Sequence, residues 1–389
     1  MRKAMPNEKI QMTNPPTPFI KGGQQGDLPF LQACLPVRQG GSGGISFVPL
    51  IVGYGFMILS FFSSLSYATD FEEHIERGFQ LAYEERYEEA RKEFEEVIQE
   101  DPENPAGYFF LSGLIGLCMN DFSTLEPEGE FLHSIEEALE HARGKIEKNP
   151  LDAWAHFFLG GSYGYRAYHN HQKREFLNAF GDALKAVESL KRAIEIDSTL
   201  YDAYMGVGGY HYFIHELWGV VPFVTKDPKE GIREVRIAME KGRYSRIASK
   251  NGLILLLLRE KEYTTALKLA LELVGEYPLN RTFNWTLTKV FREMGDWERA
   301  LLTYERLLHL IEEGQPGNLY NFLSCQLEMA EVYYYLKREE VSTELCINIL
   351  QEIRKANPPS REWGKGFPHP RNLEKETKRL LKKAKMRRN

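Results

Sequence analysis

The chain has 389 residues, of which 43% are hydrophobic and 27% are charged, so it can build a large core and is not a disordered chain. The formal net charge of -6 is mild and excludes a uniformly basic surface for nucleic acid. Charge is unevenly placed, because residues 71–104 are dense in Glu while residues 371–389 are dense in Lys and Arg.

Residues 1–45 are rich in Gly, Pro and Gln and have no apolar periodicity, which predicts a disordered low-complexity segment. Residues 46–68 form an almost uncharged apolar stretch that ends in small residues, Ser66 and Ala68, as a secretory signal does before its cleavage site. A membrane anchor is the alternative, because the stretch approaches the roughly 20 residues of a spanning helix; an internal core helix is another. The first two alternatives predict an exported protein, periplasmic or anchored at the cell envelope.

Residues 69–358 carry a pattern that recurs at a spacing of about 34 residues. A small residue is followed by a larger one four places later and usually by Pro about eight places further, as in Ala90, Phe94 and Pro102. Units of this kind are antiparallel helix pairs that cannot bury their apolar face alone and therefore stack. We predict an all-α fold, an α-solenoid of about six to seven stacked helix pairs.

The chain resembles the tetratricopeptide-repeat (TPR) family over roughly residues 71–357, and a small set of positions carries the resemblance. The matching positions are the turn Leu159, Gly160 and Tyr163, the alanines Ala90, Ala138, Ala186, Ala266 and Ala300, and the prolines Pro102, Pro150 and Pro278. The resemblance implies a right-handed superhelix with a concave groove, and it carries over no catalytic residue. The central part resembles exported bacterial TPR proteins of undefined activity and, more faintly, the eukaryotic inclusion-body-clearance group.

Tyrosines and one arginine gather on two successive first helices or just beyond them. Tyr and Arg offer large, rigid contact area with a polar end, and they are enriched where interfaces concentrate their energy. We predict that a groove for a partner is lined by Tyr165, Arg166, Tyr168, Tyr204, Tyr210 and Tyr212. Core positions are the alternative, because Tyr also occupies ordinary internal sites in this fold.

Residues 217–224 are apolar and lack helical periodicity. If exposed, Trp218 and Phe223 would form a hydrophobic contact with a protein or a membrane. If buried, the segment would fill a gap between repeat units.

His211 and His215 lie four residues apart on an expected helix, a spacing that can present two metal ligands on one face. A third ligand is not evident, so we expect half-buried residues that pack against aromatic neighbours, and we predict no metal and no cofactor. His169 and His171 fall in a hydrophilic run and are expected to be solvated loop or helix-end residues, with metal or anion binding as the alternative. The four cysteines (Cys34, Cys118, Cys325 and Cys346) show no paired spacing and are expected to be small buried residues, with a bridge between Cys325 and Cys346 as the alternative.

Residues 359–389 are predicted to form a basic C-terminal tail or helix. A solvated tail that caps the solenoid is preferred over a lipid-binding or nucleic-acid-binding helix, because the apolar face is thin and the basic residues are confined to this end. No nucleic-acid partner is predicted.

The sequence contains no nucleophile elbow, phosphate loop, paired-cysteine site or HExxH motif. We therefore predict a non-enzymatic scaffold that binds a protein or peptide in its concave groove at the cell envelope. The alternative is a repeat protein that binds a small ligand or a metal, with a hydrolytic activity open, through His211, His215 and the tyrosines.

Overall fold

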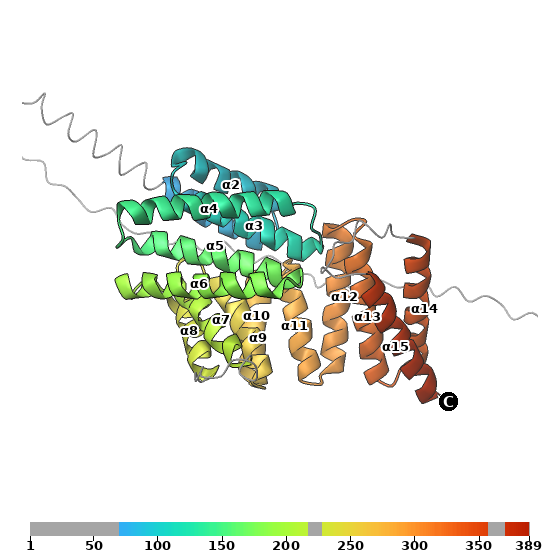
Figure 1. The fold of residues 1–389 in the computed structure, drawn as a ribbon. Coiled ribbons are helices and arrows are strands. Elements are labelled where there is room, and N and C mark those ends of the chain that lie inside the picture. Colours follow the sequence, from blue (N-terminus) through green and yellow to red (C-terminus); the bar gives the residue numbers. More distant parts are fainter. Residues whose placement is uncertain (1–69, 217–227, 357–369, 389) are drawn as a thin grey trace, which may run out of the picture. The chain divides into compact units, whose positions relative to one another are not determined.

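The computed structural model describes residues 70–216, 228–356 and 370–388, and the regular elements in these ranges are all helices. A first helix covers residues 70–83. The helices that follow are α2 (Tyr87–Glu100), α3 (Pro105–Phe122), α4 (Glu128–Lys148), α5 (Ala153–Gln172), α6 (Phe176–Ile196), α7 (Ala203–Glu216), α8 (Pro228–Lys241), α9 (Arg246–Arg259), α10 (Tyr263–Glu276), α11 (Arg281–Glu293), α12 (Trp297–Gly314), α13 (Leu319–Tyr335), α14 (Glu339–Ala356) and α15 (Pro370–Arg388) (Figure 1).

The described helices form seven consecutive pairs, from 70–83 with α2 to α13 with α14, and α15 follows the last pair. From α2 onward, each helix packs against the next one along the chain. First helices of successive pairs also touch, α3 with α5, α5 with α7 and α9 with α11. This order of neighbours is that of stacked pairs and confirms the predicted α-solenoid.

Small residues mark the places where helices of a pair approach most closely. A Cβ added to Gly160 of α5 would lie 2.9 Å from the backbone oxygen of Ala186 on α6. One added to Gly208 of α7 would lie 2.7 Å from the backbone oxygen of Gly231 on α8. Neither distance is attainable for a real side chain, so glycine is required by the close approach of the two backbones.

The turn inside a pair repeats its backbone conformation. A residue with positive φ stands two positions before the second helix in five pairs: Glu85, Arg174, Lys261, Gly295 and Lys337. Of these five residues, Gly295 is the only glycine, the residue type from which a sequence predicts a positive φ. The others adopt it at a cost of roughly 1–2 kcal/mol each, which the burial of the adjoining helices offsets.

The first pair also contacts the sixth pair, far away in sequence. Arg281, the first residue of α11, is buried between Glu85 and Asp121. Its guanidinium lies 2.7 Å from the Glu85 carboxylate and 2.5 Å from that of Asp121, and Tyr87 donates to Asp121 at 3.0 Å. We call these four residues the joint. The buried guanidinium, held by the Asp121 carboxylate and the Glu85 carboxyl group, fixes where α11 meets the first two pairs, because a displacement would leave the buried ion pair of Arg281 and Asp121 broken.

The C-terminal segment is a helix where the structure describes it. The α15 helix packs on α13 and α14 and buries Leu373, Thr377, Leu380 and Ala384. Its remaining positions are largely exposed, which suits the polar end that a stack of helix pairs needs. Residues 370–388 are therefore a docked helix, one of the two forms predicted for this segment, and not the solvated tail that was preferred, because Leu373, Leu380 and Ala384 give the helix an apolar face that packs on the existing core.

Cys325 and Cys346 are buried free thiols and Cys118 is partly buried, so the structure has no bridge between Cys325 and Cys346. Burial raises the pKa of the Cys346 thiol to about 12. Residues 1–69 lie outside the described residues, and with them the predicted disordered segment and signal or anchor. In the helices that are described, none combines the length and hydropathy of a membrane span.

Candidate functional site

An apolar cavity of about 570 Å³ lies among the first helices of the first four pairs. Its wall is formed by the helix at 70–83 together with α3, α5, α6 and α7, and by the turn that precedes α9. The aromatic and aliphatic side chains of this wall include Phe79, Phe109, Phe110, Phe157, Tyr165, Val187, Leu190, Tyr210 and Tyr244. A volume in the range of roughly 300–1,000 Å³ is that of small-molecule sites.

Glycines create much of this space. Gly164 of α5 and Gly209 of α7 both line the cavity, and an added Cβ at either position would meet no atom within 4 Å. In contrast to Gly160 and Gly208, these glycines are not required by a helix contact. Open space therefore replaces side chains on the cavity-facing sides of two neighbouring first helices.

The ring of Tyr244 closes one side of the cavity. This residue stands in the turn before α9, and its ring lies 5.1 Å from the Phe110 ring and 5.8 Å from the Phe79 ring. Asp202 holds the turn, because its carboxylate accepts the backbone N–H groups of residues 243, 244 and 245 at 2.7–3.1 Å. The tyrosine hydroxyl donates to Glu72 at 2.7 Å. Hydrogen bonds therefore hold Tyr244 both at its backbone and at the end of its side chain.

The cavity reaches solvent beside α6 and α7. Phe180 and Phe213 line it and are 41% and 47% exposed. Phe180 belongs to an exposed apolar stripe on α6, defined by Phe176, Leu177, Phe180 and Leu184. The guanidinium of Arg259 lies 5.2 Å from the Phe213 ring centre, which places a positive charge near this opening.

Polar atoms in the cavity wall are few and mostly satisfied. Asp202 is occupied by the three backbone N–H groups already described. Burial raises the pKa of Tyr165 to about 12, so its hydroxyl stays neutral at physiological pH. Ser245 Oγ is buried without a hydrogen-bond partner among the described residues. Water in such a cavity would find few partners.

The six groove residues predicted from the sequence occupy three kinds of position. Tyr165 and Tyr210 line the cavity. Arg166 makes two hydrogen bonds of 2.9 Å to Asp182, and Tyr212 is buried and donates to Glu260 at 2.9 Å. Tyr168 is exposed and Tyr204 donates to the backbone oxygen of Ser198 at 3.3 Å. The structure thus brings two of the six together in one wall.

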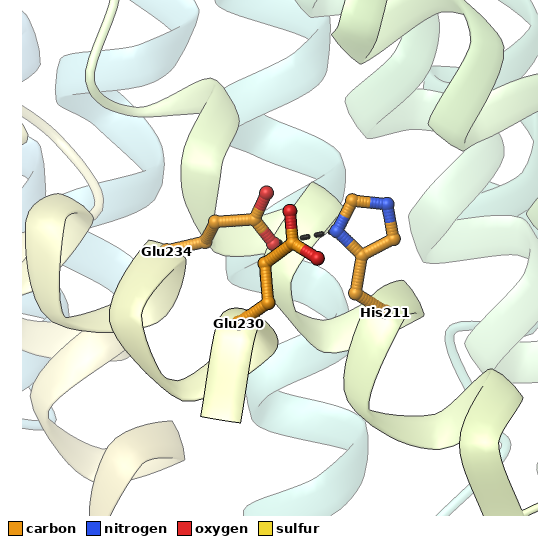
Figure 2. Close-up of side chains that lie close together, drawn as sticks. All are labelled: His211, Glu230 and Glu234. Carbon is orange, nitrogen blue, oxygen red and sulfur yellow. Dashed lines mark hydrogen bonds and ion pairs between the residues drawn. The ribbon is translucent and has the colours of Figure 1, made fainter. Parts of the chain in front are cut away.

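His211 belongs to a cluster with two glutamates of α8, shown in Figure 2. Its Nδ1 lies 2.6 Å from Glu234, and one ligand-type atom from each of His211, Glu230 and Glu234 falls within 4.8 Å of the others. His211 is buried, and the short contact to Glu234 ties α7 to α8. The side chain of His215 lies outside what the structure describes, as do Trp218 and Phe223.

His169 is buried, contrary to the expectation that it is solvated. Its Nε2 lies 2.9 Å from Glu128 at the start of α4, and Lys173 contacts the same carboxylate at 2.6 Å. The hydrophilic run that suggested solvation is the end of α5, which reaches back to the preceding pair. Together Lys173 and His169 lower the pKa of Glu128 against the opposing effect of burial.

No protein-family model matches the chain, and no curated protein matches it. Among solved structures, the chain is similar to YrrB, a TPR protein with an unusual peptide-binding site, at 17% identity over 54% of this chain and 91% of that one, with a TM-score of 0.38. It is similar to PilW, a type IV pilus biogenesis factor, at 14% identity over 63% and 96%, with a TM-score of 0.42. A thermophilic TPR protein of Thermus thermophilus matches at 15% identity over 57% and 98%, with a TM-score of 0.38. The likeness is to TPR proteins. It concerns the fold alone.

Sequence reasoning missed the phenylalanines and the closing tyrosine of the cavity. Phe109, Phe110 and Phe180 stand in ordinary helical patterns, and Tyr244 lies in a turn. A signal was present in the glycines, since α5 and α7 each carry more of them than one close helix contact needs. Gly in a helix interior costs roughly 0.5–1 kcal/mol relative to Ala, so surplus helical glycines indicate a requirement other than helix stability.

Proposed function

We propose that this protein is a non-enzymatic repeat scaffold that binds a protein partner at the cell envelope. The observation that supports a protein contact is the exposed stripe of α6. Its four members fall within about 100° around the helix, at 3.6 residues per turn. The neighbouring face of α6 buries Ala179, Ala186 and Leu190 in the stack, whereas Phe176 and Leu177 remain mostly in solvent.

The stripe has the composition of a contact surface for an apolar helix face. Leu177 is 91% exposed and Phe176 is 60% exposed. Scattered exposed apolar residues are normal, but several on one face of one helix mark an interaction site. An amphipathic helix is the partner element that best matches such a stripe, because it brings a complementary apolar face with polar flanks. The first-helix faces, where the sequence predicted the groove, hold the cavity and Tyr244 instead.

A photocrosslinking residue at position 177 tests the partner proposal in cells that make the native protein. We expect one discrete crosslinked protein from position 177 and none from position 302, because Leu302 is 65% exposed on α12 but stands outside the stripe. Leu184→Glu in the same protein should abolish the crosslink, since it places a charge in the apolar contact. Equal crosslinking from 177 and 302, or persistence with Leu184→Glu, would refute the proposal.

The cell-envelope part of the proposal rests on residues 46–68 and has its own test. N-terminal sequencing of the mature protein from the envelope fraction should find Thr69 as the first residue if the segment is a cleaved signal. An uncleaved protein that is released only by detergent would support the membrane anchor instead. Recovery of the full-length chain in the soluble cytoplasmic fraction would refute both.

A further inference from the structure

We propose that the cavity binds a single long hydrocarbon chain, such as the acyl chain of a fatty acid, with its polar end held at the opening beside Phe180 and Phe213. The proposal concerns the interior of the first four pairs and does not depend on the α6 stripe as a protein contact. It follows from the chemistry of the wall, the volume, the position of the opening and the glycines.

The wall favours a hydrocarbon over a peptide. An extended peptide carries a donor and an acceptor at nearly every residue, and each needs a partner when buried. The wall contains the hydroxyls of Tyr83, Tyr165, Tyr210 and Ser245, too few to satisfy an extended peptide, whereas the Tyr244 hydroxyl donates to Glu72 and the Asp202 carboxylate already accepts three backbone N–H groups. A hydrocarbon chain has no donor or acceptor that needs a partner. It would also displace water molecules that find few hydrogen-bond partners in this wall.

The volume suits a long chain. An apolar cavity of about 150 Å³ admits benzene. The cavity here is 570 Å³, about four times larger, and by the same scale it admits on the order of twenty carbon atoms. A short fatty acid such as octanoate would leave much of the space empty and forfeit contact with the wall.

The opening suits an anionic polar end. Phe180 and Phe213 line the cavity and are partly exposed, so an apolar chain can enter along two aromatic side chains. The guanidinium of Arg259 lies 5.2 Å from the Phe213 ring centre and places a positive charge beside the opening, which favours an anionic group there over a cationic one. No lysine or arginine lines the described part of the cavity. Because nothing there would stabilise a buried negative charge, the anionic end of the ligand should stay at the opening.

Two glycines allow the cavity to be filled without a steric clash at the backbone. Gly164→Leu and Gly209→Leu would each add a side chain whose Cβ meets no atom within 4 Å and whose remaining atoms enter the cavity. Leu also has a better helix propensity than Gly. Gly144→Leu on α4 is the matched control, because an added Cβ is equally free there and Gly144 does not line the cavity.

The experiment uses the full chain and 11-(dansylamino)undecanoic acid, whose fluorescence rises in an apolar site, with palmitate as the competitor. We expect saturable binding, displacement by palmitate and much weaker displacement by octanoate. Gly164→Leu and Gly209→Leu should each weaken probe binding at least tenfold, whereas Gly144→Leu should bind as the wild type does. Helical circular dichroism and the melting temperature verify that each variant is folded.

Other outcomes separate this inference from the proposed function. Leu184→Glu should leave probe affinity unchanged while it abolishes the protein crosslink from position 177, because Leu184 belongs to the stripe and does not line the cavity. If Leu184→Glu removes probe binding and the two cavity variants do not, the probe binds the stripe and the inference is overturned. Probe affinity that is equal in the wild type and both folded cavity variants overturns it as well.

Discussion

The first four helix pairs and the pairs from α11 to α14 follow the same repeat but differ in what their first helices face. Helices α3, α5 and α7 turn Gly113, Gly161, Gly164 and Gly206 toward an apolar cavity. Helices α11 and α13 contain no glycine. There Arg292 of α11 forms ion pairs with Glu328 and Glu331 of α13. One pattern of helix pairs thus supports an empty apolar space in one region and a filled charged surface in the other.

The difference shows that the repeat determines how helices pair, while side-chain length on the first helices determines whether a site exists. Long charged side chains span the distance between neighbouring first helices and pair with each other. Gly164 and Gly209 leave open space beside them, whereas Gly113, Gly161 and Gly206 make room for the side chains of Tyr165, Phe109 and Leu190. A hydrocarbon-binding site and a charged surface are therefore both available to one architecture.

The joint is the strongest test of this comparison, because it connects the region with the cavity to the charged region. Arg281→Ala should destabilise the protein by roughly 3–5 kcal/mol, since it leaves the Asp121 carboxylate buried without its cation. Urea unfolding at pH 7 measures the change. The control is Arg338→Ala, which removes an exposed ion pair to Glu298 and should cost no more than about 1 kcal/mol. Equal effects would show that the joint does not connect the two regions.

Adjacent glycines of α7 sharpen the distinction between contact glycines and cavity glycines. Gly208→Ala should destabilise by roughly 1–3 kcal/mol, because the new methyl group meets the backbone of α8. Gly209→Ala should be neutral or stabilise by roughly 0.5–1 kcal/mol, because its methyl group enters open space. Thermal and urea unfolding of the two variants decide the matter. A similar cost at both positions would mean that the cavity is collapsed in solution.

The joint also predicts a pH dependence. Burial, and then the charge of Asp121, raise the pKa of Glu85 to about 8, whereas an unfolded Glu has a pKa of about 4.3. The native state therefore keeps a proton that the unfolded chain releases. This contribution to stability is complete below the unfolded pKa and is lost as the pH rises toward 8.

Glu85→Gln keeps the neutral form at every pH and should reduce the loss of stability between pH 5 and 8 by about 1 kcal/mol or more. Urea midpoints of the variant and the wild type at several pH values measure the difference. Parallel curves for the two proteins would contradict the assignment of a raised pKa to Glu85.

The smallest expected effect concerns His211. His211→Gln should cost about 1 kcal/mol, because it weakens a buried hydrogen bond to Glu234. We expect no change in the melting temperature of the wild type on addition of Zn²⁺ to chelator-free protein. A Zn²⁺-dependent rise in melting temperature that disappears in Glu230→Gln would instead assign a metal to the cluster of Figure 2.

The sequence by itself determined the helix pairs and their order. Apolar residues at helical spacing and small residues at the helix contacts are local features, and Ala90, Phe94 and Val97 are buried as that spacing requires. The sequence also predicted a basic C-terminal segment that is either a tail or a helix. It placed Tyr165 and Tyr210 among the candidates for a binding surface.

Only the tertiary structure decided which of these residues form a site. Gly160 and Gly164, like Gly208 and Gly209, are the same residue type a few positions apart, yet one of each pair touches a backbone and the other faces open space. The cavity depends on Tyr244, which a distant turn brings against Phe79, and the joint links Arg281 to Asp121 across 160 residues. Such contacts join segments whose sequences carry no mutual signal, because periodicity describes the face of one helix and not the element that later covers it.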